Sequence, residues 1–141
     1  MPDYRYYCPI QVRYGDLDPQ GHVNNARYLT FTEQARVSYL VKLGLWDGVS
    51  FMDLGLIVAD LHISYLAPIL ISQSIQVGVR VNRIGNKSLH FDYQIEDKDT
   101  AQVMSRCETV MVAYDYHTHA SMPVSSSWRE IISAFEGLPD R

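Results

Sequence analysis

The sequence predicts an α+β domain in which one long central helix is wrapped by a curved antiparallel β-sheet. A mostly apolar segment at 25–43 has helical character, and three long segments after 74 alternate apolar and polar residues with a period of two. Short polar turns separate these segments, which is typical of an antiparallel meander. Because 141 residues is about the length of one domain, we expect residues 1–141 to form a single domain.

The first expected strand covers 4–14, and its apolar positions Ile10, Val12 and Tyr14 would form a half-buried face. A loop rich in Gly, Asp and Pro follows at 15–22. Asn24 is a suitable N-cap for the helix at 25–43, and Gly44 stands at its expected end. Apolar residues cover most of the helix circumference, which predicts a helix enclosed by protein.

Alternating apolar residues then predict four more strands. In the first of them Ile57, Leu61 and Tyr65 belong to one apolar face. The run Ser127-Trp128-Arg129-Glu130 is typical of a capping box, so a short C-terminal helix is expected at about 127–136. The four strands are expected at 57–65, 75–82, 89–95 and 101–114.

Composition and charge restrict the possible partners. A net charge of -4 argues against broad nucleic-acid binding, because neutralising phosphates requires clustered Lys and Arg. The most apolar window, 54–71, contains Asp60 and His62, so no membrane span is predicted. The N-terminus does not have the pattern of a secretory signal, and we expect a cytoplasmic protein in which Cys8 and Cys107 are buried thiols.

The segment Tyr14-Gly-Asp-Leu-Asp-Pro-Gln-Gly-His-Val-Asn-Asn-Ala-Arg-Tyr28 resembles the signature of hotdog-fold acyl-CoA thioesterases of the 4-hydroxybenzoyl-CoA thioesterase type. This resemblance implies a hotdog fold and hydrolysis of a thioester. It places Asp18 at the position of the catalytic carboxylate, acting as a nucleophile or as a general base for water. It places Asn25 where a backbone N–H at the helix start polarises the thioester carbonyl, in keeping with the positive end of a helix dipole.

For several residues of this segment, a structural role is the alternative to a catalytic one. Asp16 is interpreted as structural, and an Asx turn or a helix cap is the alternative for Asp18 as well. A similar run in plant acyl-carrier-protein thioesterases combines an acid, an amide and a histidine, which correspond here to Asp18, Gln20 and His22. His22 is therefore either a base or a residue that braces the loop. Tyr14 either shapes the pocket or belongs to the core.

Two further groups of polar residues lie outside this segment. Lys87 and Ser88 resemble the stretch that contacts the coenzyme A phosphates in this family, and a solvated surface charge is the alternative for Lys87. Glu33 and Arg36 are three residues apart on the expected helix, and we interpret them as a buried pair. No metal ion and no cofactor is expected, because thioester cleavage has a good leaving group.

The predicted function is hydrolysis of an acyl-CoA to a free carboxylic acid and coenzyme A. An acyl-carrier-protein thioesterase is one alternative, and a non-catalytic protein that binds acyl thioesters is another. A single hotdog domain leaves a sheet edge and part of its helix uncovered, so a homodimer through edge pairing, or a homotetramer, is expected.

Overall fold

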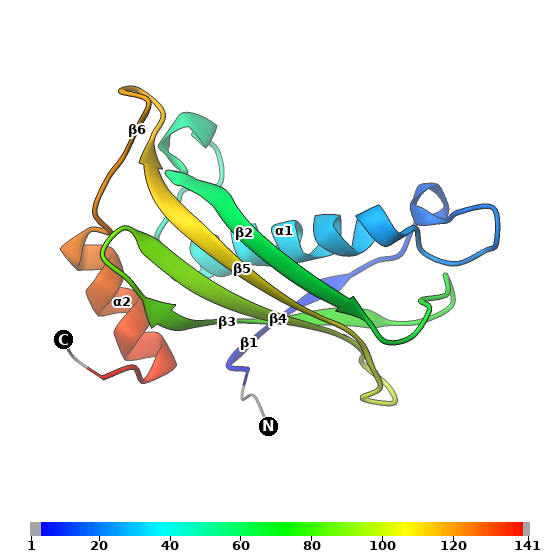
Figure 1. Cartoon of the computed structure of the whole chain (residues 1–141). Coiled ribbons are helices and arrows are strands. Elements are labelled where there is room, and N and C mark those ends of the chain that lie inside the picture. Colours follow the sequence, from blue (N-terminus) through cyan, green and yellow to red (C-terminus); the bar gives the residue numbers. More distant parts are fainter. Residues whose placement is uncertain (1–3, 140–141) are drawn as a thin grey trace.

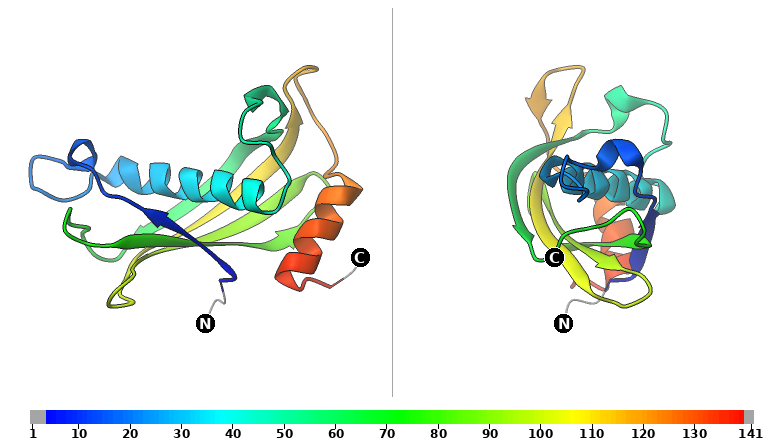
Figure 2. Two further views of the ribbon diagram at one scale, coloured as in Figure 1. Left: turned by 180° about the vertical axis from the view of Figure 1, so that it is seen from behind. Right: turned by 90° about the vertical axis from the view of Figure 1, so that its right-hand side faces the viewer.

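The computed structural model describes residues 4–139, in which an antiparallel sheet curls around one long helix (Figures 1 and 2). The strands follow the order β1-β3-β4-β5-β2, and β6 pairs with the end of β5. This hotdog arrangement confirms the predicted fold class. The elements are β1 (Tyr6–Ile10), η1 (Tyr14–Asp16), α1 (Asn25–Lys42), η2 (Phe51–Asp53), β2 (Leu56–Tyr65), β3 (Ile75–Ile84), β4 (Ser88–Asp97), β5 (Val103–Asp115), β6 (Ala120–Ser121) and α2 (Ser126–Glu136).

The first strand is shorter than predicted. β1 ends at Ile10, and Val12 is still buried, but Tyr14 is 85% exposed and does not continue the buried face. The backbone N–H of Arg13 is bonded to the carboxylate of Asp16, at 2.8 Å, instead of to a neighbouring strand. This local bond turns the chain into the short helix η1, which the alternating pattern did not indicate.

The prediction that α1 is enclosed on all sides is wrong for the single chain. α1 packs on β1, β3 and β4, and it buries one face that includes Phe31, Ala35 and Leu40. The opposite face exposes Glu33 and Gln34.

β2 likewise buries less than its alternating pattern predicted. It lies at the edge of the sheet, and a bulge interrupts its pairing with β5 between Val58 and Asp60. Leu61 and Tyr65, which were expected on a buried face, remain 39% and 46% exposed.

The C-terminal helix begins slightly earlier than predicted. Ser125, not Ser127, is the N-cap of α2, and its hydroxyl accepts a hydrogen bond from the backbone N–H of Trp128 at 3.2 Å. The capping box that Ser127 and Glu130 suggested is therefore not formed, because the chain offers a serine two residues earlier.

Tyr39 connects α1 to three other elements. Its ring is fully buried and makes edge-on contacts with Tyr6, Phe91 and Phe135 at centroid distances of 5.8–6.0 Å. Its hydroxyl donates to the carboxylate of Glu136 at 2.6 Å, and the same carboxylate accepts the backbone N–H of Val81 at 2.9 Å. Burial raises the pKa of Tyr39, so its hydroxyl stays protonated and continues to donate.

Arg36 is buried, but it does not pair with Glu33 as predicted. Its guanidinium donates to the hydroxyl of Tyr93 at 3.0 Å, and Tyr93 lies 3.3 Å from the hydroxyl of Thr109. Glu33 lies on the exposed face of α1, because three residues turn a helix by about 300° and so leave Glu33 about 60° away from the buried Arg36 around the helix axis. The hydroxyl of Tyr93 thus takes the place that we assigned to the carboxylate of Glu33.

Cys8 and Cys107 are free and buried, as predicted. Within residues 4–139, no helix is both long enough and apolar enough to cross a membrane.

We predict that Tyr39→Phe lowers the free energy of unfolding by about 1–2 kcal/mol, because Glu136 loses a buried hydrogen-bond donor. Urea unfolding followed by circular dichroism measures this change. Tyr14→Phe is the matched control, since its exposed ring should change stability by less than about 0.5 kcal/mol. Equal stability of the two variants would contradict the role of this hydrogen bond.

Candidate active site

The loop before α1 is closed by backbone pairing. Leu17 and Val23 form an antiparallel bridge, and the backbone N–H of Asp18 donates to the carbonyl of His22 at 2.8 Å. The backbone N–H of Asn24 donates to the carbonyl of Asp16, also at 2.8 Å. These bonds hold Asp18 in a tight turn that leads directly into the N-terminus of α1.

The carboxylate of Asp18 is oriented by this turn. Its Oδ1 accepts backbone N–H groups from Gln20 at 2.9 Å and from His22 at 3.3 Å. Its Oδ2 has no hydrogen bond to any residue between 4 and 139, and the side chain is half-buried. One oxygen therefore fixes the orientation of the group, and the other remains available to a substrate or a water molecule.

Within the described residues, the N-terminus of α1 retains an unpaired backbone donor. Asn24 caps the helix through its side-chain oxygen, which accepts the backbone N–H of Ala26 at 2.9 Å. The backbone N–H of Asn25 has no partner within the part of the chain that the structure describes. An unpaired N–H at the positive end of a helix dipole is suited to stabilise an oxyanion.

Asp16 has a different environment from Asp18. It is 4% exposed, its Oδ2 accepts the backbone N–H of Arg13, and its Oδ1 lies 3.8 Å from Nε of Arg27. Both oxygens of the carboxylate are therefore engaged within the protein. This geometry agrees with the interpretation of Asp16 as a structural residue.

His22 and Tyr14 belong to the same loop region, and their side chains form no hydrogen bond with the other described residues of that loop. The ring of His22 is half-buried and makes no hydrogen bond to residues 4–139; only its backbone braces the loop. Tyr14, in η1, is largely exposed, which rules out the core position considered for it. Both side chains therefore remain accessible next to Asp18.

Tyr65 belongs to this site although nothing in the sequence indicated it. Its hydroxyl donates to the backbone carbonyl of Asn25 at 3.0 Å, and its ring packs edge-on against Tyr28 at 4.9 Å. Tyr65 thus braces the first turn of α1 from the end of β2. The contact joins residues 40 positions apart, and no local pattern could have revealed it.

Lys87 and Ser88 lie away from the other predicted site residues. They stand where the turn after β3 leads into β4, next to α2 and at the opposite end of the sheet from the loop of Asp18 (Figure 1). Nζ of Lys87 donates to the hydroxyl of Ser121 at 3.3 Å. The structure therefore brings together Tyr14, Asp18, His22 and Asn25, and it separates Lys87 and Ser88 from them within one chain.

No group of three or more His, Cys, Asp or Glu side chains in residues 4–139 is arranged to hold a metal ion. Nε2 of His117 lies 3.1 Å from Oδ1 of Asp53, and both side chains are exposed.

Comparison with known proteins decides the family to which this loop and fold belong. Residues 12–132 match the model of the thioesterase-like superfamily, a range that includes the Asp18 loop, α1 and the strands from β2 to β6. The chain belongs to this superfamily. It is therefore a thioester hydrolase, as the sequence predicted. The narrower resemblance to the 4-hydroxybenzoyl-CoA type stays a prediction.

Individual relatives agree with this membership. A thioesterase from Thermus thermophilus, crystallised with coenzyme A and zinc, is 31% identical, with a TM-score of 0.86 over 99% of this chain and 100% of its own. The long-chain acyl-CoA thioesterase FadM of Escherichia coli is 27% identical over 121 residues, which are 86% of this chain and 92% of FadM. The acyl-CoA thioesterase YbgC of Haemophilus influenzae is 29% identical over 97 residues, which are 67% of this chain and 71% of YbgC.

We predict that Asp16→Ala lowers the free energy of unfolding by about 1–3 kcal/mol, because the backbone N–H of Arg13 loses its acceptor. Thermal unfolding by calorimetry measures this change. Asp18→Asn is the control, because an amide oxygen can still accept the N–H groups of Gln20 and His22. If Asp18→Asn were the less stable of the two, the roles assigned to these acids would be reversed.

Proposed function

We propose that the protein hydrolyses an acyl-CoA thioester to a free carboxylic acid and coenzyme A. The observation that carries the proposal is that, among residues 4–139, Oδ2 of Asp18 is free in the same loop that presents the unpaired N–H of Asn25. Relatives that are named acyl-CoA thioesterases, and one crystallised with coenzyme A, support this choice of substrate.

In the proposed reaction, the N–H of Asn25 binds the thioester carbonyl oxygen and stabilises the negative charge that develops on it. Asp18 either attacks the carbonyl carbon and expels the thiolate, leaving an acyl anhydride that water then hydrolyses, or it removes a proton from a water molecule that attacks the carbonyl carbon directly. The thiolate of coenzyme A is a good leaving group, since an ordinary thiol has a pKa near 8.5. We assign His22, in the same loop as Asp18, a role in transferring protons during this reaction.

Replacing Asp18 with Asn should reduce kcat at least about 100-fold, because the amide is neither a nucleophile nor a base. Release of free thiol from short, long and aromatic acyl-CoAs measures the rate. Glu108→Gln is the matched control, since it neutralises an exposed acid on β5 without touching the site. A fully active Asp18→Asn enzyme would refute the assignment of this carboxylate.

Two alternatives give different results in the same assay. An acyl-carrier-protein thioesterase would release thiol from a carrier-protein thioester but not from acyl-CoAs. A protein that only binds acyl thioesters would bind these compounds without any release of thiol. The acyl-CoA proposal has the better support, because the relatives named above carry that substrate in their names.

We further propose that the active form is a homodimer joined through β2. The outer edge of β2 has no strand partner within residues 4–139, and its side chains Val58 and Leu61 are 49% and 39% exposed. A free edge with exposed apolar side chains favours pairing with a second chain. Antiparallel pairing of two β2 strands would place the Leu56 end of one chain next to the Tyr65 end of the other.

This arrangement gives Lys87 and Ser88 a place in the site of the partner. The ten residues of β3 span roughly 33 Å, so Lys87 and Asp18 of one chain lie near opposite ends of the sheet. A two-fold axis at the middle of β2 reverses the second chain and brings its Lys87 toward the end that carries Asp18. Lys87 would then contact the coenzyme A of the neighbouring site.

Lys87→Ala is expected to raise KM for an acyl-CoA roughly tenfold at nearly constant kcat, since a charged contact to phosphate is lost. Mixing Lys87→Ala and Asp18→Asn subunits then tests the dimer. If Lys87 serves the partner, each mixed dimer contains one site with both residues intact, and KM returns to the wild-type value. If KM stays high in the mixture, Lys87 acts within its own chain or on no site at all.

A further inference from the structure

Arg36 is a buried cation with no counter-ion among the described residues of its own chain. The residue is 8% exposed, and its Nη1 donates to the hydroxyl of Tyr93 at 3.0 Å. Burial raises the pKa of Tyr93, so this partner is neutral. No carboxylate of residues 4–139 forms an ion pair with the guanidinium. A buried charge without an opposite charge beside it destabilises a protein, which favours a partner for Arg36 from outside the chain.

Two donors of Arg36 can be reached from outside. Its Nε and Nη2 atoms form no hydrogen bond with residues 4–139. In the same range, Oε1 of Glu96 is the only fully enclosed side-chain nitrogen or oxygen that lacks a hydrogen-bond partner. The free nitrogens of Arg36 are therefore not enclosed by the chain, and an acceptor on another molecule can approach them.

Arg36 extends from the side of α1 that faces away from β1. Ser38, two residues further along α1, forms a hydrogen bond with Tyr6 of β1. β1 and β2 are the opposite edges of the sheet. Because two residues turn a helix by about 200°, Arg36 extends to the other side, toward β5 and β2.

The guanidinium of Arg36 is also level with the middle of β2. The hydroxyl of its partner Tyr93 lies 3.3 Å from the hydroxyl of Thr109, and Thr109 is paired with Leu61 of β2. β2 covers Leu56–Tyr65, so Leu61 is next to its midpoint. A two-fold axis through the middle of β2 would therefore pass near this level of both chains.

Glu33 is an unpaired acid on the same side of α1. It is about 60° from Arg36 around the helix axis. It is exposed, and it forms no hydrogen bond or ion pair with residues 4–139. Leu29 and Val37, about one turn before and after Glu33, are half-buried apolar residues. An acid between two apolar side chains forms a stripe that can pack against a second helix.

A two-fold axis at β2 would bring these opposite charges together. Such an axis keeps the two α1 helices on one face of the joined sheet and reverses their directions. Glu33 and Arg36 are about 4.5 Å apart along α1. Glu33 of one chain is therefore within reach of Arg36 of the other when both arginines are level with the axis. In an isologous interface each contact occurs twice, so two such ion pairs would form.

We propose that this side of α1 is a contact surface for a second copy of the chain, in which Glu33 of each subunit pairs with Arg36 of the other. The inference rests on the proposed dimer through β2, but not on the catalytic role of Asp18. Each guanidinium gains the counter-ion that its own chain does not supply. Leu29 and Val37 shield the pair from water.

A charge exchange between two chains tests the proposal. Glu33→Arg leaves only cations at the contact, and Arg36→Glu leaves only acids. Each variant alone should dimerise at least about tenfold more weakly than the wild type, because like charges meet at the interface. An equimolar mixture should recover the wild-type affinity, because every contact then joins a cation to an acid. Sedimentation velocity over a concentration series measures the affinity, and native mass spectrometry identifies the mixed dimer.

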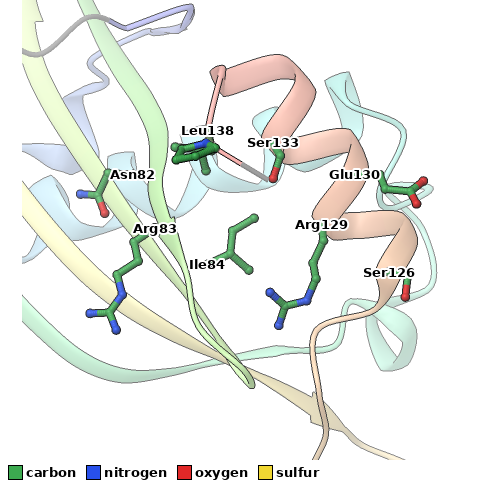
Figure 3. Close-up of a pocket in the computed structure, with 9 residues that line it drawn as sticks. Asn82, Arg83, Ile84, Ser126, Arg129, Glu130, Ser133 and Leu138 are labelled. Atoms are coloured by element: carbon green, nitrogen blue, oxygen red, sulfur yellow. The ribbon is translucent and has the colours of Figure 1, made fainter. Parts of the chain in front are cut away.

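Glu130→Arg is the matched control, because it makes the same change of charge on α2, away from β2 (Figure 3). It should leave the affinity of the dimer unchanged. Circular dichroism shows whether Arg36→Glu is folded. If it is not, a double-mutant cycle with Glu33→Gln and Arg36→Gln takes its place. Each of these changes should weaken the dimer, and the double variant should be weakened by less than the sum of the two effects.

Two results would overturn the proposal. One is a mixture of folded variants that dimerises no better than the separate chains, and the other is a cycle in which the two effects are additive. If the wild type is dimeric in such a case, only the ion pair is refuted, whereas a monomeric wild type would refute the dimer as well. Thiol release by the wild type is measured separately, so a failure of the proposed hydrolysis is distinguished from a failure of this contact.

Discussion

The packing of Tyr39 determines how the layers of this protein meet. Its ring contacts one residue each of β1, β4 and α2. Its hydroxyl donates a hydrogen bond to Glu136, whose carboxylate also accepts the backbone N–H of Val81 in β3. α1 is thereby fixed in the curl of the sheet at one end, while Tyr65 braces its other end. Because a helix is rigid over this length, fixing both ends also fixes the direction of its N-terminal N–H groups.

The sequence was most informative where local rules govern structure. The alternation of Val77, Val79 and Val81 predicted a strand that is fully buried on one face, and the positions of Asn24 and Gly44 marked the ends of α1 to within about a residue. The loop around Asp18 was recognised from residue types that are close together in the chain. All of these features depend on neighbours within a few residues, so one sequence is sufficient to predict them.

Predictions that depended on distant contacts were less successful. The apolar face of β2 was expected to be buried, but β2 is an edge strand, and the side chain of Leu61 remains partly exposed in one chain. Arg36 was assigned the wrong partner, because the hydroxyl of Tyr93 comes from a strand 57 residues away. Both errors arise from the topology of the sheet, which periodicity alone does not determine.

The burial of both cysteines has a practical consequence for studying the enzyme. Burial raises the pKa of Cys8 and raises that of Cys107 to about 11, so at neutral pH both remain protonated and shielded from solvent. Reagents that detect thiols react with the exposed thiolate. A rapid colour change in such an assay would therefore report the thiol released from the substrate, and a slow additional signal from the protein itself would report the opening of its core.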